Sequence, residues 1–170
     1  MMDLPAIVQK AYHSKLNLFL LNWFLGRIVP FNRPHGIRIV EINKEFVKTR
    51  IPYIRRNFNH IKGLHACVLA TLSEFTTGFL LLSRLDNKQY RIIMKKLEMN
   101  YHFQGKMDAY AEFSIQEEWL EKNIYTPLKE FESVEIPCEV KVFDHQGNHL
   151  TTGWIHWQIK AWSKVKTRVD

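Results

Sequence analysis

The sequence is poor in cysteine, with only Cys67 and Cys138 among its 170 residues, and the two lie far apart without the spacing of a metal motif. This excludes a zinc-binding module or a small disulfide-stapled domain, because both need closely spaced cysteines. We therefore expect two reduced thiols in a cytoplasmic protein and no metal site. Internal repeats, low-complexity segments and interior linkers are also lacking, so the chain is expected to form one domain.

Long hydrophobic runs are lacking too. The most apolar stretch, residues 16–31, is shorter than the roughly 20 residues that a membrane-spanning helix needs. It is also interrupted by Asn17, Asn22 and Arg27. No small-x-small cleavage site follows it, which argues against a signal peptide. We expect this stretch to lie on the domain or at a dimer contact.

A second hypothesis for residues 16–31 stays open. Phe19, Trp23 and Phe24 are bulky, and Lys10 and Lys15 nearby are basic. This combination is found in helices that rest on membrane surfaces. The alternative is therefore a membrane-surface-associated, lipid-binding protein.

Acidic residues are outnumbered by basic ones. The 24 Lys and Arg against 17 Asp and Glu give a formal charge of +7, which favours an anionic partner such as nucleic acid, a membrane surface or a phosphate-bearing small molecule. The cations are scattered, without a long run and without interleaved aromatic residues, so we expect no nucleic-acid partner.

Hydrophobic periodicity divides the chain into helices and strands. The predicted elements are helices at 4–29, 64–84 and 114–124 and strands at 36–43, 46–53, 90–103, 108–115, 134–144 and 149–162. Ser114 and Glu117 have the spacing of a capping box for the third helix. Turns are predicted at Asn43-Lys44, at Gly105 between two strands, and at residues 144–148.

The helix at 64–84 is apolar or small on every face. On a helical wheel one narrow arc carries the bulkiest residues, which are Val68, Leu72, Phe75, Phe79 and Leu82. The remaining positions are mostly Ala, Cys, Leu, Thr, Ser and Gly, so the helix is expected to be enclosed. Glu74 lies in its middle, and a buried carboxylate needs either a partner or a raised pKa.

Antiparallel hairpins around one buried helix define an α+β fold. We divide the chain into an N-terminal helical segment packed on the domain (1–35), the domain itself (36–163) and a charged tail (164–170).

This order of elements resembles the hotdog-fold thioesterases, in which a curved antiparallel sheet wraps a long central helix. Relatives of the phenylacetyl-CoA and 4-hydroxybenzoyl-CoA type have His-Gly-Gly at the start of that helix and an acid nine residues after the His. His65 and Glu74 have this separation, but Ala66 and Cys67 replace the two glycines, and Gly78 stands where some relatives have Thr. The N-terminal helical segment places the chain closest to an uncharacterised thioesterase-like branch.

The resemblance implies hydrolysis of an acyl-CoA or related thioester. The Ala66 N–H at the helix N-terminus would bind the oxyanion, and the Asn59 amide would contact the same carbonyl or a water. Glu74 would act as general base or nucleophile. In relatives with Thr at the position of Gly78, the hydroxyl could orient the attacking water, and here the Thr77 hydroxyl would take that role. His65 is a weaker candidate for an acid or base.

Each of these residues also has a structural interpretation. Glu74 could be held by donors at a dimer contact, His65 could pack at the helix start, and Asn59 could shape the loop. A Cys67 and His65 nucleophile pair is not expected, because neighbouring helix positions point in different directions.

The resemblance also implies a homodimer or a tetramer built as a dimer of dimers. One subunit gives the donor end of the helix and its mate gives the acid, because Ala66 and Glu74 are about 12 Å apart on one helix. No cofactor is expected beyond the coenzyme A moiety of the substrate, whose phosphates Arg55, Arg56 and Lys106 would contact. The alternative is a non-catalytic acyl- or CoA-binding module.

Overall fold

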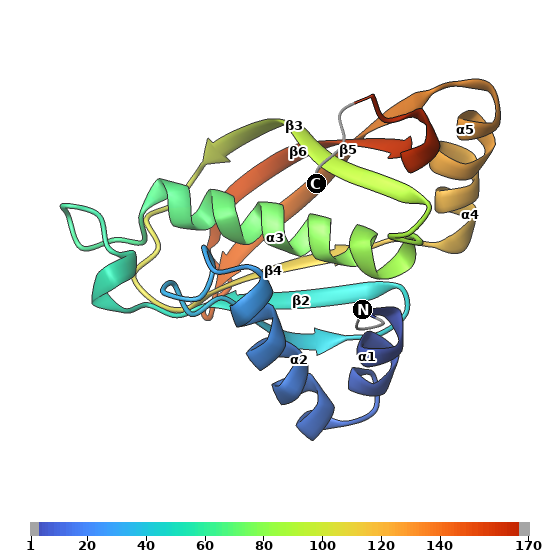
Figure 1. Cartoon of the computed structure of the whole chain (residues 1–170). Helices are drawn as coiled ribbons and strands as arrows, with labels where there is room; N and C mark the ends of the chain where they lie inside the picture. Colours follow the sequence, from blue (N-terminus) through green and yellow to red (C-terminus); the bar gives the residue numbers. More distant parts are fainter. Residues whose placement is uncertain (1–3, 167–170) are drawn as a thin grey trace.

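The protein is a six-stranded antiparallel sheet curled around one long helix (Figure 1). The computed structural model describes residues 4–166. The strands, in the spatial order β1-β2-β4-β5-β6-β3, are β1 Arg38–Ile42, β2 Phe46–Ile51, β4 Ala109–Ser114, β5 Ser133–Asp144, β6 His149–Ala161 and β3 Tyr90–Tyr101. The central helix is α3, Ala66–Arg84. The α+β class and the hotdog arrangement are confirmed.

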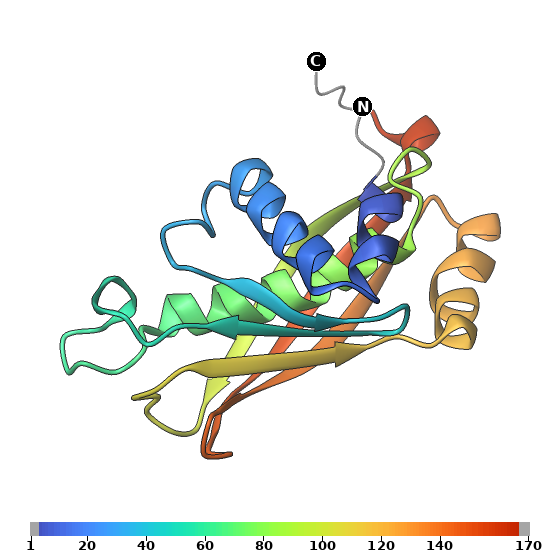
Figure 2. The same ribbon diagram turned by 90° about the horizontal axis from the view of Figure 1, so that it is seen from below.

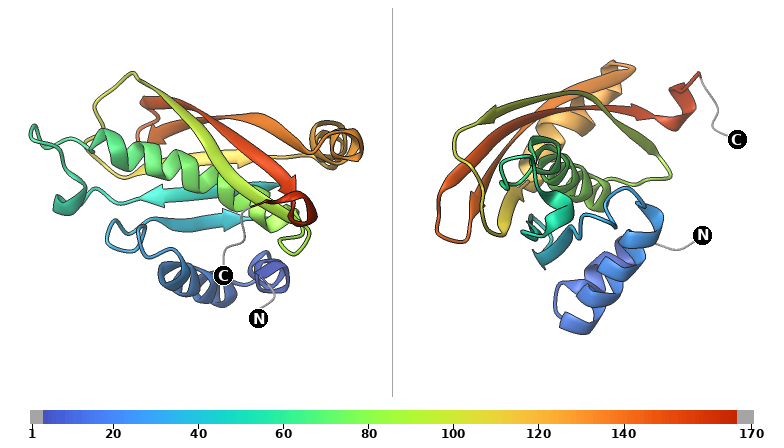
Figure 3. Two further views of the ribbon diagram at one scale, coloured as in Figure 1. Left: turned by 45° about the horizontal axis from the view of Figure 1, so that its top comes forward. Right: turned by 90° about the vertical axis from the view of Figure 1, so that its left-hand side faces the viewer.

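Helix α3 lies against the concave side of the sheet, and its core face was largely predictable. Val68, Leu72, Phe75 and Phe79 are buried as expected. Leu82 is 37% exposed, so its assignment to the core is wrong. The sheet covers one side of the helix only, as the end-on view in Figure 3 makes clear, and complete enclosure within the protomer is therefore also wrong.

By length and composition α3 is the one helix within residues 4–166 able to cross a membrane. It instead packs against the sheet along one side, and 61% of its most apolar stretch is buried inside the protein. The buried face even includes hydroxyl groups, because each finds a partner. The Thr76 hydroxyl lies 2.6 Å from that of Thr49 on β2 and donates to the Leu72 carbonyl.

The N-terminal segment forms two helices where one was predicted. Helix α1 spans Leu4–Ala11 and α2 spans Lys15–Ile28. The break comes at Ser14, whose Oγ accepts the Asn17 N–H at 3.3 Å and so acts as an N-cap. Figure 2 shows both helices at the β1 side of the sheet.

Asn22 ties α2 to the outer edge of β1. Its Oδ1 accepts the Ile39 N–H at 2.8 Å and its Nδ2 donates to the Ile39 carbonyl at 2.9 Å. One side-chain amide thus satisfies a donor and an acceptor that a neighbouring strand would otherwise pair. Leu21 and Leu25 are buried on the same side of the helix.

The predicted turn around Gly105 does not join neighbouring strands. β3 pairs with β6 at the edge of the sheet, whereas β4 pairs with β2 and β5. The loop 102–108 therefore crosses the end of the sheet. The β1–β2 and β5–β6 hairpins are as expected, with Gly147 at φ +83° in the second turn.

The third predicted helix has a different start and a different end. Ser114 is the last residue of β4, and α4, Glu117–Leu120, has Gln116 at its N-cap without a side-chain cap, so the capping box is wrong. The helix then continues through a π-helical turn, Glu121–Tyr125, into α5, Thr126–Glu130. The wider turn accommodates Pro127, which has no N–H to donate.

Short 3-10 turns flank these elements, η1 at Arg55–Asn57 and η3 at Trp162–Lys164. Of the predicted charged tail at 164–170, residues 167–170 lie outside the described part of the chain, as do residues 1–3 of the N-terminal segment.

Gly78 should be intolerant of a side chain. A Cβ at this position would lie 2.7 Å from the Trp157 ring, whose Nε1 donates to the Thr77 hydroxyl at 3.1 Å. Gly78→Ala is therefore expected to destabilise the fold by about 1–3 kcal/mol through overpacking, measured by urea unfolding.

Gly26→Ala in α2 is the matched control. The nearest atom to its Cβ would be the Arg33 Cγ at 3.9 Å, so the substitution adds helix propensity without a clash. We expect a gain of roughly 0.5–1 kcal/mol. Equal effects of the two substitutions would contradict this account of Gly78.

Candidate active site

The first turn of α3 presents one unpartnered amide. The Cys67 N–H donates to His65 Nδ1 at 3.1 Å, and the Val68 and Leu69 N–H groups donate to the His65 carbonyl at 3.0 and 3.3 Å. Within residues 4–166 the Ala66 N–H has no acceptor. A helix N-terminus carries partial positive charge, so this free donor suits an anionic oxygen.

Two contacts from the far end of β3 hold this amide in place. The Leu64 N–H donates to the Gly105 carbonyl at 2.8 Å, which joins the loop before α3 to the loop after β3. The Tyr101 hydroxyl donates to the Ala66 carbonyl at 3.0 Å. The Tyr101 contact holds the peptide group after the Ala66 Cα, and the bonds to the His65 carbonyl hold the one before it, so the orientation of the free N–H is set before any ligand binds.

Asn59 lies in the loop that leads into α3. Its Oδ1 accepts the Ile61 N–H at 3.1 Å and the Gly63 N–H at 2.9 Å. These two donors identify the oxygen, so the other end of the amide is the NH₂ group, which has no acceptor in the described part of the chain. Asn59 therefore shapes the loop and still offers a donor.

A pocket of about 360 Å³ opens at this end of the helix. It is lined by Asn59, Leu64, Ala66, Leu69, Tyr101, His102, Phe103, Gln104 and Gly105. A larger hollow, of about 490 Å³, lies on the outside of β2, β4 and β5, but strand and turn side chains line it and no helix begins there. The chemistry of the lining therefore favours the smaller pocket.

Glu74 is half-buried on the side of α3 that the sheet leaves open. It shares this side with Cys67, Thr71 and Leu82, which are half-buried or exposed. Burial raises the pKa of Glu74 above its ordinary value near 4.5. Within residues 4–166 its carboxylate makes neither a salt bridge nor a hydrogen bond. The structural role considered for Glu74 thus has no partner inside the protomer.

Glu74 and the free amide are separated along the same helix. The eight residues from Ala66 to Glu74 correspond to about 12 Å at the rise of an α-helix. The protomer therefore brings Asn59 and Ala66 to one pocket and leaves Glu74 away from it.

The Thr77 side chain is part of the buried core. It is fully buried, its Oγ accepts the Trp157 Nε1–H at 3.1 Å, and it lies 3.2 Å from the Ser73 and Glu74 carbonyls. The water-orienting role predicted for Thr77 gains no support from these contacts.

His65 is the N-cap of α3. Its Nδ1 accepts a backbone N–H, so that nitrogen carries no proton in this arrangement. The contact is to the Cys67 amide, and no hydrogen bond joins the ring to the thiol in the described residues. The ring makes a helix cap, which agrees with the packing role considered for it.

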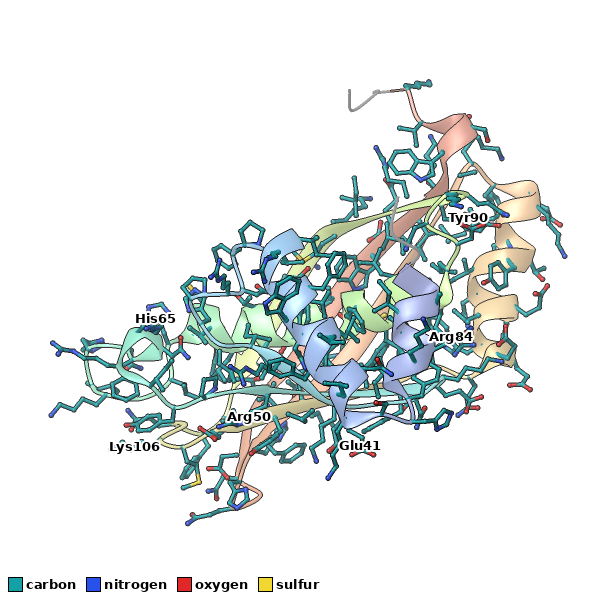
Figure 4. All side chains as sticks on the ribbon, turned by 60° about the horizontal axis from the view of Figure 1, so that its bottom comes forward. Glu41, Arg50, His65, Arg84, Tyr90 and Lys106 are labelled. Atoms are coloured by element: carbon teal, nitrogen blue, oxygen red, sulfur yellow. The ribbon has the colours of Figure 1, made fainter. Side chains whose placement is uncertain are left out.

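The cations predicted to contact coenzyme A lie on exposed loops at the pocket end of α3. Arg55 and Arg56 belong to η1 in the loop before α3, and Lys106 belongs to the loop after β3. Figure 4 shows Lys106 and His65 at the same end of the molecule. Arg56 donates to the Pro34 carbonyl at 3.0 Å, so its guanidinium is partly engaged.

Sequence reasoning missed Tyr101 and the Gln104 side chain. Tyr101 ends β3, and the Gln104 side chain lies where a Cβ on Gly63 would be, at 2.8 Å. The end of β3 and the loop after it lie about 40 residues beyond the Asn59 loop, and no local signal pairs these two regions. Within residues 4–166 no group of three His, Cys, Asp or Glu side chains could hold a metal ion.

Several solved structures have the same architecture. A Pseudomonas aeruginosa protein of unknown function, described as a probable thioesterase, superposes with a TM-score of 0.78 at 24% identity over 84% of this chain and 95% of its own. A mutant thioesterase from Pseudomonas aeruginosa matches with a TM-score of 0.66 at 12% identity, over 88% and 98%. A thioesterase from Haemophilus influenzae matches with a TM-score of 0.66 at 10% identity, over 88% and 94%.

At these identities the likeness shows the hotdog fold. No curated protein is significantly similar to the chain in sequence. The model of one family, described as a domain of unknown function (DUF4442), matches residues 19–159, from α2 to the end of the sheet. The chain therefore belongs to the DUF4442 family.

Proposed function

We propose that this protein hydrolyses acyl-CoA or related thioesters at a site shared between two protomers. The observation that carries the proposal is the unpartnered Ala66 N–H at the mouth of a pocket, on the same helix as an unpaired, half-buried Glu74. The thioesterase descriptions of the structural neighbours support the reaction class by analogy.

The pocket supplies donors for the charge that develops in the reaction. Attack of water on a thioester carbonyl forms a tetrahedral oxyanion, which then collapses with loss of the CoA thiolate. The Ala66 N–H and the Asn59 Nδ2 are two free donors at one pocket, and fixed donors of this kind contribute most to such reactions. Because loop contacts hold both groups, they need no rearrangement when the charge appears.

Glu74 is the group that takes the proton from water. Burial raises its pKa, and a carboxylate whose pKa approaches the working pH is a better base than an exposed one. Direct attack by Glu74, giving a transient anhydride, uses the same residue as nucleophile. In both routes the acid must reach a carbonyl held by Ala66, which a protomer alone does not allow.

A second protomer supplies the missing half. β3 is an edge strand of 12 residues whose outer N–H and C=O groups have no partner strand within residues 4–166. Ile93 and Met94 on it are 43% and 40% exposed, and Leu82 of α3 is exposed on the open side of the helix. Antiparallel pairing of two β3 strands about a two-fold axis would bring the two α3 helices alongside each other in opposite directions. Each Glu74 then approaches the other helix's N-terminus.

The loops around the pocket suit the phosphates of coenzyme A. Arg55 and Lys106 are exposed and form no salt bridge within the described residues, so their charge is free for a ligand. Asp108, an acid on the loop after β3, is paired with Arg50.

Glu74→Gln is expected to lower kcat/KM by about 10²–10⁴ across a panel of acyl-CoA esters, because it removes the base while keeping the side-chain shape. Release of free CoA thiol measures the rate. Glu139→Gln, at an exposed acid of β5, is the matched control and should retain full activity. CoA binding by the wild type without any hydrolysis would instead favour a non-catalytic ligand-binding module.

Mixed dimers test whether the site is shared. Asn59→Asp keeps the oxygen that holds the loop and replaces the free NH₂ with an acceptor. Glu74→Gln and Asn59→Asp protomers should each be inactive alone. After random assortment they should regain about one quarter of wild-type activity, because half the dimers are mixed and each mixed dimer has one intact site. Absence of any recovery, with mixed dimers verified by mass spectrometry, would rule out the shared site.

The raised pKa of Glu74 also predicts a pH-dependent stability difference. The folded protein retains a proton that the unfolded chain releases near pH 4.5, so stability falls as pH rises through the raised pKa. Glu74→Gln is neutral at every pH and should therefore have a higher Tm than wild type at neutral pH. The difference should vanish below pH 4.5. A Tm difference that does not vary with pH would contradict the buried carboxylate.

A further inference from the structure

The outward face of α2 is a row of large apolar side chains with no protein cover. Leu16, Phe19, Leu20 and Trp23 are 68%, 62%, 48% and 54% exposed. They fall within an arc of about 100° on the helical wheel, opposite the buried Leu21 and Leu25 side. Such a contiguous row differs from the scattered apolar residues of an ordinary surface, and it marks an interaction surface.

Two more exposed apolar side chains lie at the end of the helix. Ile28, in the last turn of α2, and Phe31, in the loop that follows, are 51% and 66% exposed. Figures 1 and 3 show α2 outside the β1 edge, projecting away from the sheet and from α3. The surface is thus a protruding ridge, a shape that enters a soft layer more readily than it fits a preformed protein groove.

The charge around this ridge has one sign. Residues 4–40 contain none of the 17 acidic residues of the chain, and they contain five basic ones, which are Lys10, Lys15, Arg27, Arg33 and Arg38. None of the five forms a salt bridge within residues 4–166. Their charge is therefore uncompensated and complementary to a negatively charged surface.

The cations lie beside the apolar row. A hollow of about 340 Å³ on one side of α2 is lined by Arg27, Arg33 and Arg38, and a hollow of about 290 Å³ on the other side includes Lys10. The Arg27 guanidinium stacks over the Trp23 ring, 3.3 Å from its centroid. An amphipathic tryptophan with cations beside it is the arrangement found at the boundary between lipid headgroups and acyl chains.

From these observations we propose that the α2 ridge docks this protein on an anionic phospholipid bilayer. The apolar side chains enter the acyl boundary, and the five cations contact the lipid phosphates. The docking does not depend on the thioesterase activity.

The ridge is also connected to the candidate active site. The loop after α2 is joined to η1 by the Asn57 Nδ2, which donates to the His35 carbonyl at 2.9 Å, and by the Arg56 bond to Pro34. η1 leads directly into the Asn59 loop. Docking through α2 would therefore hold the pocket loops near the lipid surface. This position suits a long-chain acyl substrate, an inference about the substrate that rests on the proposed function.

Vesicle co-sedimentation tests the docking without any substrate. The full-length protein should pellet with phosphatidylcholine vesicles that contain about one quarter phosphatidylglycerol and remain soluble with phosphatidylcholine alone, and added salt should weaken the binding. The double variant Phe19→Glu with Trp23→Glu should bind at least roughly tenfold more weakly, because it removes two apolar anchors and adds two negative charges. Phe131→Glu, at a 59% exposed aromatic next to α5, is the control and should bind like wild type.

Fluorescence quenching by brominated lipids gives a second measure. Trp23→Phe keeps the apolar row, so it should still bind the vesicles but lose most of the quenching. The proposal is overturned if the wild type does not bind the anionic vesicles at low salt, or if Phe131→Glu is impaired as much as the double variant. It is also overturned if light scattering shows that the double variant dissociates an oligomer of the wild type, since a second copy would then cover the ridge.

Discussion

The packing of α3 against the concave side of the sheet is the constraint on which the other features depend. The contact is close enough that Gly78 lies under the Trp157 ring and the Ser73 Cβ lies within 3.4 Å of the position of a Cβ on Gly153. At such distances a buried polar group on this face needs a partner within the protein, which Thr49, Thr76, Thr77 and Trp157 have and the Thr151 hydroxyl lacks among the described residues. Cover is incomplete at Glu74, which is half-buried, although Gly78 one turn later lies under Trp157. The Glu74 carboxylate therefore lies at the margin of the covered face.

The amino-acid pattern was sufficient to predict the helices and strands, but not to predict which strands pair with each other. The residue pattern identified all six strands, and the alternation is clearest in β5 and β6, each of which buries one side. The pairing of β3 with β6 depends on residues about 60 positions apart, and a turn-like sequence around Gly105 favoured the wrong partner. Helix boundaries were also mispredicted. Ser114 has the spacing of a capping box but belongs to β4. Ser14, the N-cap that separates α1 from α2, was overlooked.

The candidate site was predictable where its signal is local. A carboxylate in an apolar helix and a free amide at a helix start follow from the sequence around Ala66 and Glu74 alone. The contributions of Tyr101 and Gln104 depend on how two loops meet, and burial of the Thr77 hydroxyl depends on the position of Trp157. Such tertiary contacts cannot be predicted from the spacing of residues along a helix.

Basic residues lie both beside the α2 ridge and on the loop that leads to the pocket. The acid-free residues 4–40 include the α2 ridge, and two further cations, Arg55 and Arg56, lie on the loop that leads to the pocket. Hydrogen bonds join the loop after α2 to η1, so these two basic regions are in contact. The ligands of the two proposals, an anionic phospholipid and an acyl-CoA, share a negatively charged head and an apolar tail, and both complement basic residues beside apolar ones.

The Asn22 side chain at β1 has a consequence for assembly. By occupying the Ile39 N–H and carbonyl it blunts one border of the sheet, while β3 at the other border keeps its full length of unpaired backbone. A sheet with two open borders can add copies indefinitely and grow into a fibre, whereas a sheet with one open border can join a single twin and then has nothing left to extend. One amide on a surface helix thus makes the β1 border less able than the β3 border to pair with another copy.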